Sequence, residues 1–133
     1  MIRLKKSAFI LFLLSMAAGP LHAIPDGTQG KLLYDKHCSI CHSMSPPPKS
    51  APPILGITMH YHQAFADRKD GVTHMVTFMK KPDAKQSKLE AAAVSRFGLM
   101  PAMTLSDKEL EAVAGWLWES YDPNFKSPGN CAK

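Results

Sequence analysis

The chain has 133 residues, of which 45% are hydrophobic and 20% charged, and its formal net charge is +5 at pH 7. A basic chain can bind nucleic acid, but no Gly-rich phosphate loop and no interleaving of basic and aromatic residues supports that class of partner. Three of the positive charges, Arg3, Lys5 and Lys6, stand at the N-terminus, and without them thirteen basic residues face eleven acidic ones. We therefore expect no nucleic-acid partner, and the remaining length suits one small domain.

Residues 1–23 have the pattern of a secretory signal peptide. The positive residues precede an apolar stretch from Ala8 to Ala18, and Leu21-His22-Ala23 offers a cleavage site that ends in alanine. The apolar stretch is too short to span a bilayer. We predict a cleaved leader over 1–23 and a mature domain over 24–133, exported to the periplasm. The chain would touch a membrane only through this leader, if the leader is not removed.

The segment after the leader predicts a first helix from about Thr28 to Cys38, with Asp26 or Thr28 as its cap. One face of this helix could meet another helix, and it carries Gly30, Leu33 and Tyr34.

The first helix ends in a C-x-x-C-H motif, Cys38-Ser39-Ile40-Cys41-His42, which is typical of covalent c-type haem attachment. Cysteines three residues apart project from one side of a helical turn, so both sulfurs can form thioethers to the two vinyl groups of one haem edge. His42 follows at once and would bind the iron. A thioredoxin-like dithiol would need a βαβ context, and half a zinc site would need a second ligand pair, which neither Cys131 nor the scattered histidines supply.

Cys131 is the cysteine left over, close to the C-terminus. The tail that holds it contains Pro123, Pro128 and Gly129, a composition that argues against continued helix. We expect a monomer with an incidental thiol, and the alternative is a dimer linked through Cys131.

The middle of the chain predicts a loop and two helices. Residues 43–53 contain five prolines, which exclude a regular helix and favour an extended loop. A short helix is predicted over Thr58–Ala66, and Asp70 is expected to cap a stronger helix that ends at Pro82. The residues at i, i+3, i+4 and i+7 of the stronger helix form a stripe expected to pack as core against the haem: Val72, Met75, Val76 and Met79.

Two further helices complete the prediction. One runs from about Lys85 to Arg96 and stops at Gly98, with its inner face made by Leu89, Ala92 and Ala93. The last begins at a capping box over Ser106-Asp107-Lys108-Glu109 and continues to Pro123 on an apolar face made by Leu110, Val113, Ala114, Leu117 and Tyr121.

Trp116 and Trp118 lie on other sides of the last helix, so at least one is expected to cover the haem or a neighbouring loop. No strand pattern and no internal repeat interrupts the helices. The predicted fold is all-α, with about four to five helices wrapped around one covalent haem.

The order of these features resembles the class I monohaem cytochromes c, and the resemblance covers essentially the whole mature chain. The proximal loop of that family reads roughly Gly-Pro-x-Leu-x-Gly, and Ala51-Pro52-Pro53-Ile54-Leu55-Gly56 matches it except at the first position. The resemblance implies that the Pro52 carbonyl accepts a hydrogen bond from the ring of His42 and fixes its tautomer.

The resemblance also implies a methionine followed by proline as the second axial ligand, a pattern that Gly98-Leu99-Met100-Pro101 carries. We take Met100 as this ligand, with Met103 as its competitor, because a soft thioether favours ferrous iron and raises the potential. The other methionines are expected to fill the core, namely Met44, Met59, Met75 and Met79. The nitrogen alternatives are His60, His62 and His74, whereas His37 is expected to be an ordinary polar side chain.

Together these features predict an extracytoplasmic electron carrier, not an enzyme, with one covalent haem c held by His42 and Met100. Its partners would be a redox protein donor and acceptor that bind transiently. Lys80, Lys81, Lys85 and Lys88 are interpreted as a solvated face, with a docking patch for an acidic partner as the alternative.

Two other functions stay open. One is a peroxidase-like haem enzyme or gas-binding protein with an open sixth position, in which Arg96 and Tyr61 are candidates for a distal acid–base pair. The other is an electron-transfer subunit of a larger oxidoreductase.

Overall fold

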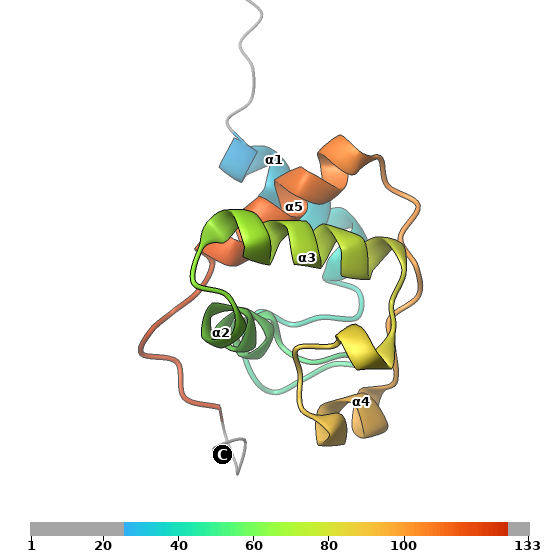
Figure 1. Cartoon of the computed structure of the whole chain (residues 1–133), viewed down its shortest axis with the longest axis vertical. Helices are drawn as coiled ribbons and strands as arrows, with labels where there is room; N and C mark the ends of the chain where they lie inside the picture. Colours follow the sequence, from blue (N-terminus) through green and yellow to red (C-terminus); the bar gives the residue numbers. More distant parts are fainter. Residues whose placement is uncertain (1–25, 128–133) are drawn as a thin grey trace, which may run out of the picture.

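The computed structural model describes residues 26–127, and within that range it contains five α-helices, one π-helical turn, one 3-10 turn and no strand. The all-α prediction is confirmed. In Figure 1, α1, α3 and α5 gather in one part of the molecule, while α2 and α4 lie below α3 in this view. The predicted leader and Cys131 lie outside the described residues.

α1 (Asp26–Leu33) runs directly into a π-helical turn, η1 (Tyr34–Cys38), which ends at the first cysteine of the motif. The wider turn is closed by a hydrogen bond of 2.9 Å from the Ser39 amide to the Tyr34 carbonyl, five residues back. The first helix therefore begins two residues before the predicted Thr28 and changes type before it delivers Cys38.

The face predicted on the first helix meets α5 (Asp107–Glu119). Gly30 is needed at this crossing, since a Cβ there would collide with the Ala112 carbonyl and with Trp116. The ring of Tyr34 packs on that of Trp116, with 5.0 Å between the two centroids. The two helices approach closely enough to set the position of η1 against the rest of the domain.

α5 is the central helix of the core, and Leu110, Val113 and Ala114 on it are fully or almost fully buried. The predicted capping box is confirmed, because Ser106 accepts from the Glu109 amide and Glu109 accepts from the Ser106 amide. The helix ends at Glu119, before the predicted Pro123, because the Ser120 hydroxyl donates to the Trp116 carbonyl at 2.8 Å and closes the last turn.

α3 (Arg68–Lys80) packs against α5. The prediction that Asp70 caps this helix is wrong. Asp67 is the cap, with extended backbone and a carboxylate that accepts from the Asp70 amide at 3.0 Å. The helix therefore starts one turn earlier and brings Gly71 onto the ring of Trp118, where a Cβ would find no room.

Neither of the two tryptophans, of which at least one is expected to cover the haem or a neighbouring loop, lines the cavity described below. Trp116 packs on Tyr34 of η1, and Trp118 packs on Gly71 of α3. Both rings are used in contacts between helices, because α5 lies between α1 and α3 and both of its flanks are covered.

α2 (Ile54–Ala64) follows the Pro-rich loop and begins four residues before the predicted Thr58. Pro53 is extended at the helix entry, and the Ile54 amide donates to the Ser43 carbonyl at 2.8 Å, so the loop ends at the last proline. Thr58, expected as the first helical residue, is fully buried inside the helix.

The helix predicted from Lys85 to Arg96 is wrong. The segment instead forms a 3-10 turn, η2 (Ala84–Gln86), and a separate helix, α4 (Ala91–Phe97). Asp83 caps η2 through its side chain, and the Ser87 hydroxyl accepts from the Leu89 amide at 3.1 Å, so local side-chain bonds compete with helix between the two. α4 ends at Gly98 as predicted, with a backbone φ of 72°.

No helix among residues 26–127 has both the length and the apolar character needed to cross a membrane.

Candidate haem-binding site

A cavity of about 290 Å³ lies between the segment from His37 to His42, the end of the Pro-rich loop, α2, α3, α4, the segment before α5 and α5 itself. Most of its wall is apolar, with side chains such as Ile54, Phe78 and Leu117. The five residues predicted for the site all line it: Cys38, Cys41, His42, Pro52 and Met100.

The two cysteines lie at the end of η1 and in the turn that follows it. Cys41 is exposed and Cys38 is partly buried. Burial, with a smaller contribution from neighbouring Cys41, raises the pKa of the Cys38 thiol to about 11. Reactive dithiols and thiolate metal sites need a lowered pKa, so this environment does not favour either.

A zinc site finds no support in the described part of the chain either. No three side chains of His, Cys, Asp or Glu come together there in a way that could hold a metal ion. The two cysteines are therefore interpreted together with the adjoining His42, as parts of one C-x-x-C-H site.

His42 is fixed at both its ring and its backbone. Its Nδ1 lies 2.7 Å from the Pro52 carbonyl oxygen, so Nδ1 carries the proton and donates, and Nε2 is left with its lone pair. These are the two groups that the family resemblance names. Burial lowers the pKa of His42, and the Pro52 carbonyl offsets this only in part, so the ring is held neutral, the form that binds a metal.

The backbone contact of His42 comes from η1. The hydroxyl of Tyr34 donates to the His42 carbonyl at 2.9 Å, while the Tyr34 ring is held against Trp116 of α5. No sequence pattern predicts this contact, because the two residues are eight apart and no helical or strand period pairs them. It ties the position of the histidine to the crossing of α1 and α5.

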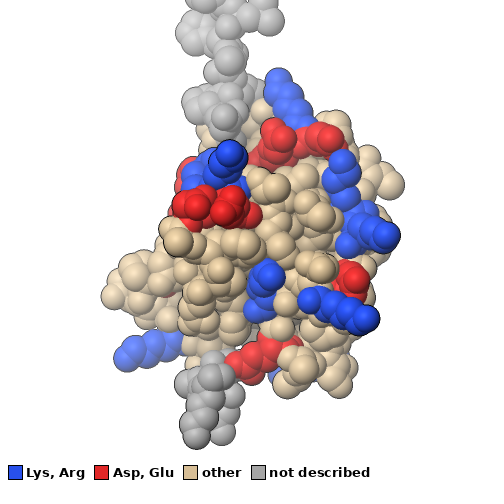
Figure 2. Space-filling model, viewed as in Figure 1, with Lys and Arg blue, Asp and Glu red and all other residues tan. Residues whose placement is uncertain are grey.

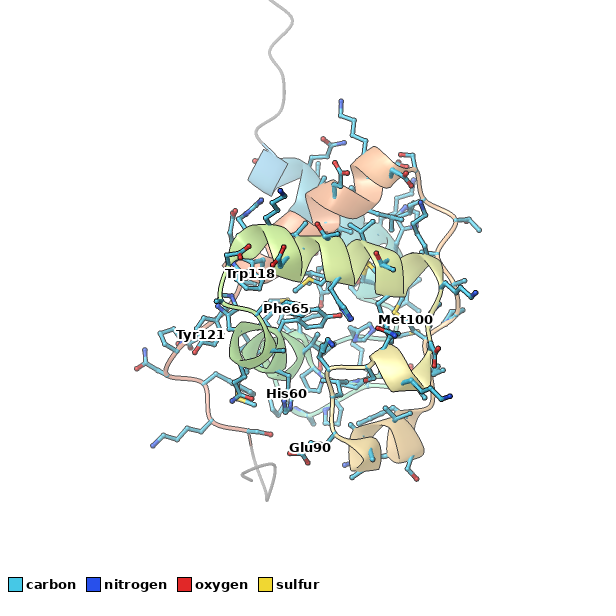
Figure 3. The ribbon with its side chains drawn as sticks, viewed as in Figure 1. His60, Phe65, Glu90, Met100, Trp118 and Tyr121 are labelled. Atoms are coloured by element: carbon cyan, nitrogen blue, oxygen red, sulfur yellow. The ribbon has the colours of Figure 1, made fainter. Side chains whose placement is uncertain are left out.

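Four methionines line the cavity, and they come from two segments. Met75 and Met79 are buried residues of α3, and Met100 and Met103 belong to the segment between α4 and α5. The Met103 amide donates to the Met79 carbonyl at 2.8 Å, which anchors that segment on α3. Figure 3 places Met100 in this segment, far from Trp118 and Tyr121 in the view.

The stripe predicted on α3 divides between two environments. Met75 and Met79 face the cavity as predicted, but Val72 and Val76 line an outer groove between α1, α3 and α5. Of the inner face predicted before Gly98, Leu89 and Ala93 line the cavity, whereas Ala92 is exposed.

None of the three histidines proposed as alternative ligands lines the cavity. His62 stacks between Trp118 and Tyr121, with centroid distances of 3.9 and 4.1 Å, and its Nε2 is 3.0 Å from the Trp118 carbonyl. His74 is hydrogen-bonded to Tyr61. His37, predicted to be an ordinary polar side chain, does line the cavity.

The candidates for a distal acid–base pair are separated. Tyr61 lines the cavity, but Arg96 does not, and its guanidinium lies 4.9 Å from the ring centroid of Phe97. The Tyr61 hydroxyl lies 3.1 Å from His74 Nδ1, so it is already engaged.

The four lysines predicted as one solvated face have different environments. Lys81 and Lys85 are exposed, and Lys80 forms an ion pair of 2.7 Å with Asp107. Lys88 is the exception to the prediction, because it is partly buried, lines the cavity and holds its ammonium 5.3 Å from the centroid of Phe65. Figure 2 shows positive and negative side chains interspersed on the face in view.

The donor set of the cavity fits a c-type haem. The thiols of Cys38 and Cys41 line the cavity together with neutral His42, whose Nε2 is available to bind a metal. Methionine thioethers from two other segments also line it, and most of the remaining wall is apolar. These are the covalent anchors, the two kinds of axial ligand and the low-polarity surroundings that such a group needs.

Comparison with known proteins gives the same result. The family described as cytochrome c oxidase, cbb3-type, subunit III matches residues 25–117. An uncharacterized protein of Aquifex aeolicus (strain VF5) is 26% identical, and the match covers 74% of this chain and 77% of the relative. No solved structure gave a significant match. A cytochrome c domain implies covalently bound haem c and electron transfer rather than enzymatic turnover. This chain therefore belongs to the monohaem cytochrome c family of the cbb3 oxidase subunit III type.

Proposed function

We propose that this protein is an extracytoplasmic electron carrier whose single haem c is attached through Cys38 and Cys41 and held by His42 and Met100 as axial ligands. The observation that carries the proposal is the cavity, since these four side chains come from two separate segments and line the same space. When bound, the haem supplies a one-electron centre that can change between ferric and ferrous iron.

The residues of the chain perform three tasks in this function. Pro52 and Tyr34 hold His42 by its ring and by its backbone, so the histidine does not have to move when the charge at the iron changes. The apolar wall excludes water from the centre. A thioether ligand such as Met100 favours the reduced state, which raises the potential relative to two nitrogen ligands.

The ligand assignment is tested by the visible and near-infrared spectra of the purified protein in both redox states. We expect low-spin ferric iron with the weak far-red band of sulfur-to-iron charge transfer. Met100→Ala should lose the band, and its potential should fall. Met103→Ala is the matched control and should keep both. Loss of the band in the Met103 variant alone would transfer the ligand role to Met103 and leave the function standing.

The same measurements separate the carrier from its main rival. In a haem enzyme or gas-binding protein the sixth position is open, so the wild type would be high-spin and would bind carbon monoxide readily. The carrier should bind carbon monoxide slowly, and Met100→Ala should bind it far faster. A high-spin wild type would overturn the carrier function in favour of this rival.

Covalent attachment has its own test. The haem should stay with the polypeptide through acid–acetone extraction and denaturing electrophoresis. Cys38→Ala or Cys41→Ala should keep one thioether and shift the alkaline pyridine spectrum, and the double variant should lose stable haem. Recovery of haem-free chain from matured wild type would contradict the proposal.

Export and partners complete the proposal. The residues 1–23 carry the pattern of a cleaved leader, which supports a location in the periplasm, where cytochrome c thioethers form. The partners would be redox proteins that dock transiently, with exposed Lys81 and Lys85 favouring an acidic surface. N-terminal sequencing of the periplasmic fraction should find the mature chain starting near Ile24. Non-reducing electrophoresis tests the expected monomer against a dimer linked through Cys131.

A further inference from the structure

A polar pair connects the wall of the haem cavity with a histidine on the side of α3 that faces α2. Tyr61 of α2 lines the cavity and is only 5% exposed, yet its hydroxyl is not directed to a cavity residue. The hydroxyl lies 3.1 Å from Nδ1 of His74, which does not line the cavity and is partly exposed. The pair therefore places a titratable ring behind the cavity wall and within reach of solvent.

The surroundings of His74 hold the ring in place. Phe65 and Phe78 flank it, with centroid distances of 5.1 and 6.5 Å, and Phe78 also lines the cavity. Figure 3 shows Phe65 in the space between α2 and α3. An imidazole between two aromatic rings keeps its orientation toward the Tyr61 hydroxyl.

Tyr61 of α2 and Lys88 of the segment after η2 face His74 from other elements. On α3 itself, Asp70 precedes His74 by four residues. Burial and then Lys88 lower the pKa of His74, and the hydrogen bonds that its ring donates to the side chain and backbone of Gln86 raise it in part. The net lowering of this pKa favours the neutral ring. Burial raises the pKa of Tyr61, so its hydroxyl keeps its proton throughout.

We propose that Tyr61 and His74 form a proton-binding site coupled to electron uptake at the haem, an inference that rests on the proposed carrier function. One electron from the donor protein reduces ferric to ferrous iron, and one proton from water binds the ring nitrogen of His74 that carries no proton in the neutral form. The only bond formed is N–H, and oxidation of the iron releases the proton again. The Tyr61 hydroxyl can donate or accept, so it stays bonded to the ring in both states.

The direction of the coupling follows from charge. An added electron lowers the charge inside the cavity by one, which favours the imidazolium form of His74. The pKa of His74 should therefore be higher in the ferrous than in the ferric protein. By linkage, the midpoint potential should be highest at low pH and should fall as pH rises through the two pKa values.

The experiment uses the haem-loaded protein. Nuclear magnetic resonance titration of His74 in both redox states should give a pKa that shifts upward on reduction. Potentiometry across the same pH range should give a falling potential in the wild type and a flat one in His74→Gln, which keeps a polar partner for Tyr61 but takes up no proton. Lys88→Gln should raise the pKa of His74 in both states.

His60→Gln is the matched control. His60 is on the same helix as Tyr61 but does not line the cavity, and in Figure 3 it lies on the side of α2 away from α3. This variant should keep the pH dependence of the wild type. Tyr61→Phe should keep the haem spectrum and weaken the dependence.

Two results would overturn the proposal. One is an equal pKa of His74 in the two redox states. The other is an unchanged pH dependence of the midpoint potential in His74→Gln, which would assign that dependence to another group such as the haem propionates. Either result in a low-spin protein with the far-red band leaves the carrier function intact. A high-spin wild type without that band would instead reject the proposed function.

Discussion

At the scale of single residues, the environment of His42 is the most specific feature of the domain. Its ring donates to Pro52, and its backbone carbonyl accepts from Tyr34. The hydrogen bond to Pro52 holds His42 against the Pro-rich loop. The hydrogen bond from Tyr34 connects His42 with the crossing of α1 and α5. The two contacts are independent, so one can be removed while the other stays.

Tyr34→Phe tests the second contact. The change leaves the His42 carbonyl without its donor, so the free energy of unfolding should fall by about 1 kcal/mol. The midpoint potential should also shift, because the backbone of the ligand is freed. Denaturant unfolding and potentiometry measure the two effects. Tyr121→Phe is the control, since that ring stacks on His62 and does not line the cavity, and it should leave the potential unchanged. An unaltered potential in Tyr34→Phe would show that Pro52 alone fixes the ligand.

Local sequence patterns predicted some of these residues and could not predict others. The motif at Cys38–His42 and the capping box at Ser106 are defined by spacing within one turn, so they are visible in the sequence. Tyr61 and His74 are thirteen residues apart and lie on two different helices, and no local rule connects such positions. The position of Lys88 could not be predicted for the same reason, because a charged residue in a polar stretch gives no sign that it lines a cavity.

At the scale of elements, small residues set how closely the helices approach. Gly30 lies under α5, and Gly71 lies under the ring of Trp118. Periodicity predicted α5 and the cavity side of α3, since each buries one continuous face. It failed for the segment from Lys85 to Arg96, where Asp83 and Ser87 bond to nearby amides and replace helix by turns.

Gly71→Ala tests the contact between α3 and α5. The new methyl group would overlap the ring of Trp118, which is 9% exposed and has little room to move, so the free energy of unfolding should fall by about 1–3 kcal/mol. Gly27→Ala on α1 is the matched control, because nothing lies within 4 Å of its Cβ position, and stability should be unchanged or rise by up to about 1 kcal/mol. Thermal or denaturant unfolding of the two variants gives the comparison. Equal stability in both would mean that Trp118 rotates away freely.

At the scale of the whole molecule, the helices enclose a space that they do not fill. The cavity of about 290 Å³ is lined mainly by apolar side chains, and without a group that covers them this surface would stay in contact with water at a cost in free energy. The haem therefore completes the core of this fold as well as giving it a redox centre.

This cost predicts the behaviour of the chain without haem. The variant with both Cys38→Ala and Cys41→Ala should lose most of its helical circular dichroism at 25 °C when no haem is supplied. The wild-type protein with attached haem should stay folded under the same conditions. A haem-free chain with native helix content and a cooperative unfolding transition would show that the cavity collapses and that the helices are stable by themselves.

The charge distribution gives a prediction about association. If an anionic partner or small anionic oxidant approaches near Lys85, Lys85→Glu should slow electron exchange severalfold at low ionic strength, and the difference should vanish at high salt. Lys108→Glu makes the same charge change on α5, beside the outer groove and away from the haem cavity, so it should have a much smaller effect. Stopped-flow rates at several salt concentrations measure both. Equal slowing by the two variants would indicate net charge rather than a docking face.

The π-helical turn at Tyr34–Cys38 affects the direction, around the axis of the first helix, in which the C-x-x-C-H motif points. An α-helix would reach the same hydrogen-bonding position with one residue fewer, and each residue of such a helix turns the chain by about 100°. The extra residue therefore sets the direction in which the cysteines leave the first helix, while Gly30 fixes the helix itself against α5. Tolerance to sequence change should differ accordingly along this segment. Exposed Asp35 and Lys36 can be exchanged for other residues, but deleting either would turn the attachment site away from the cavity.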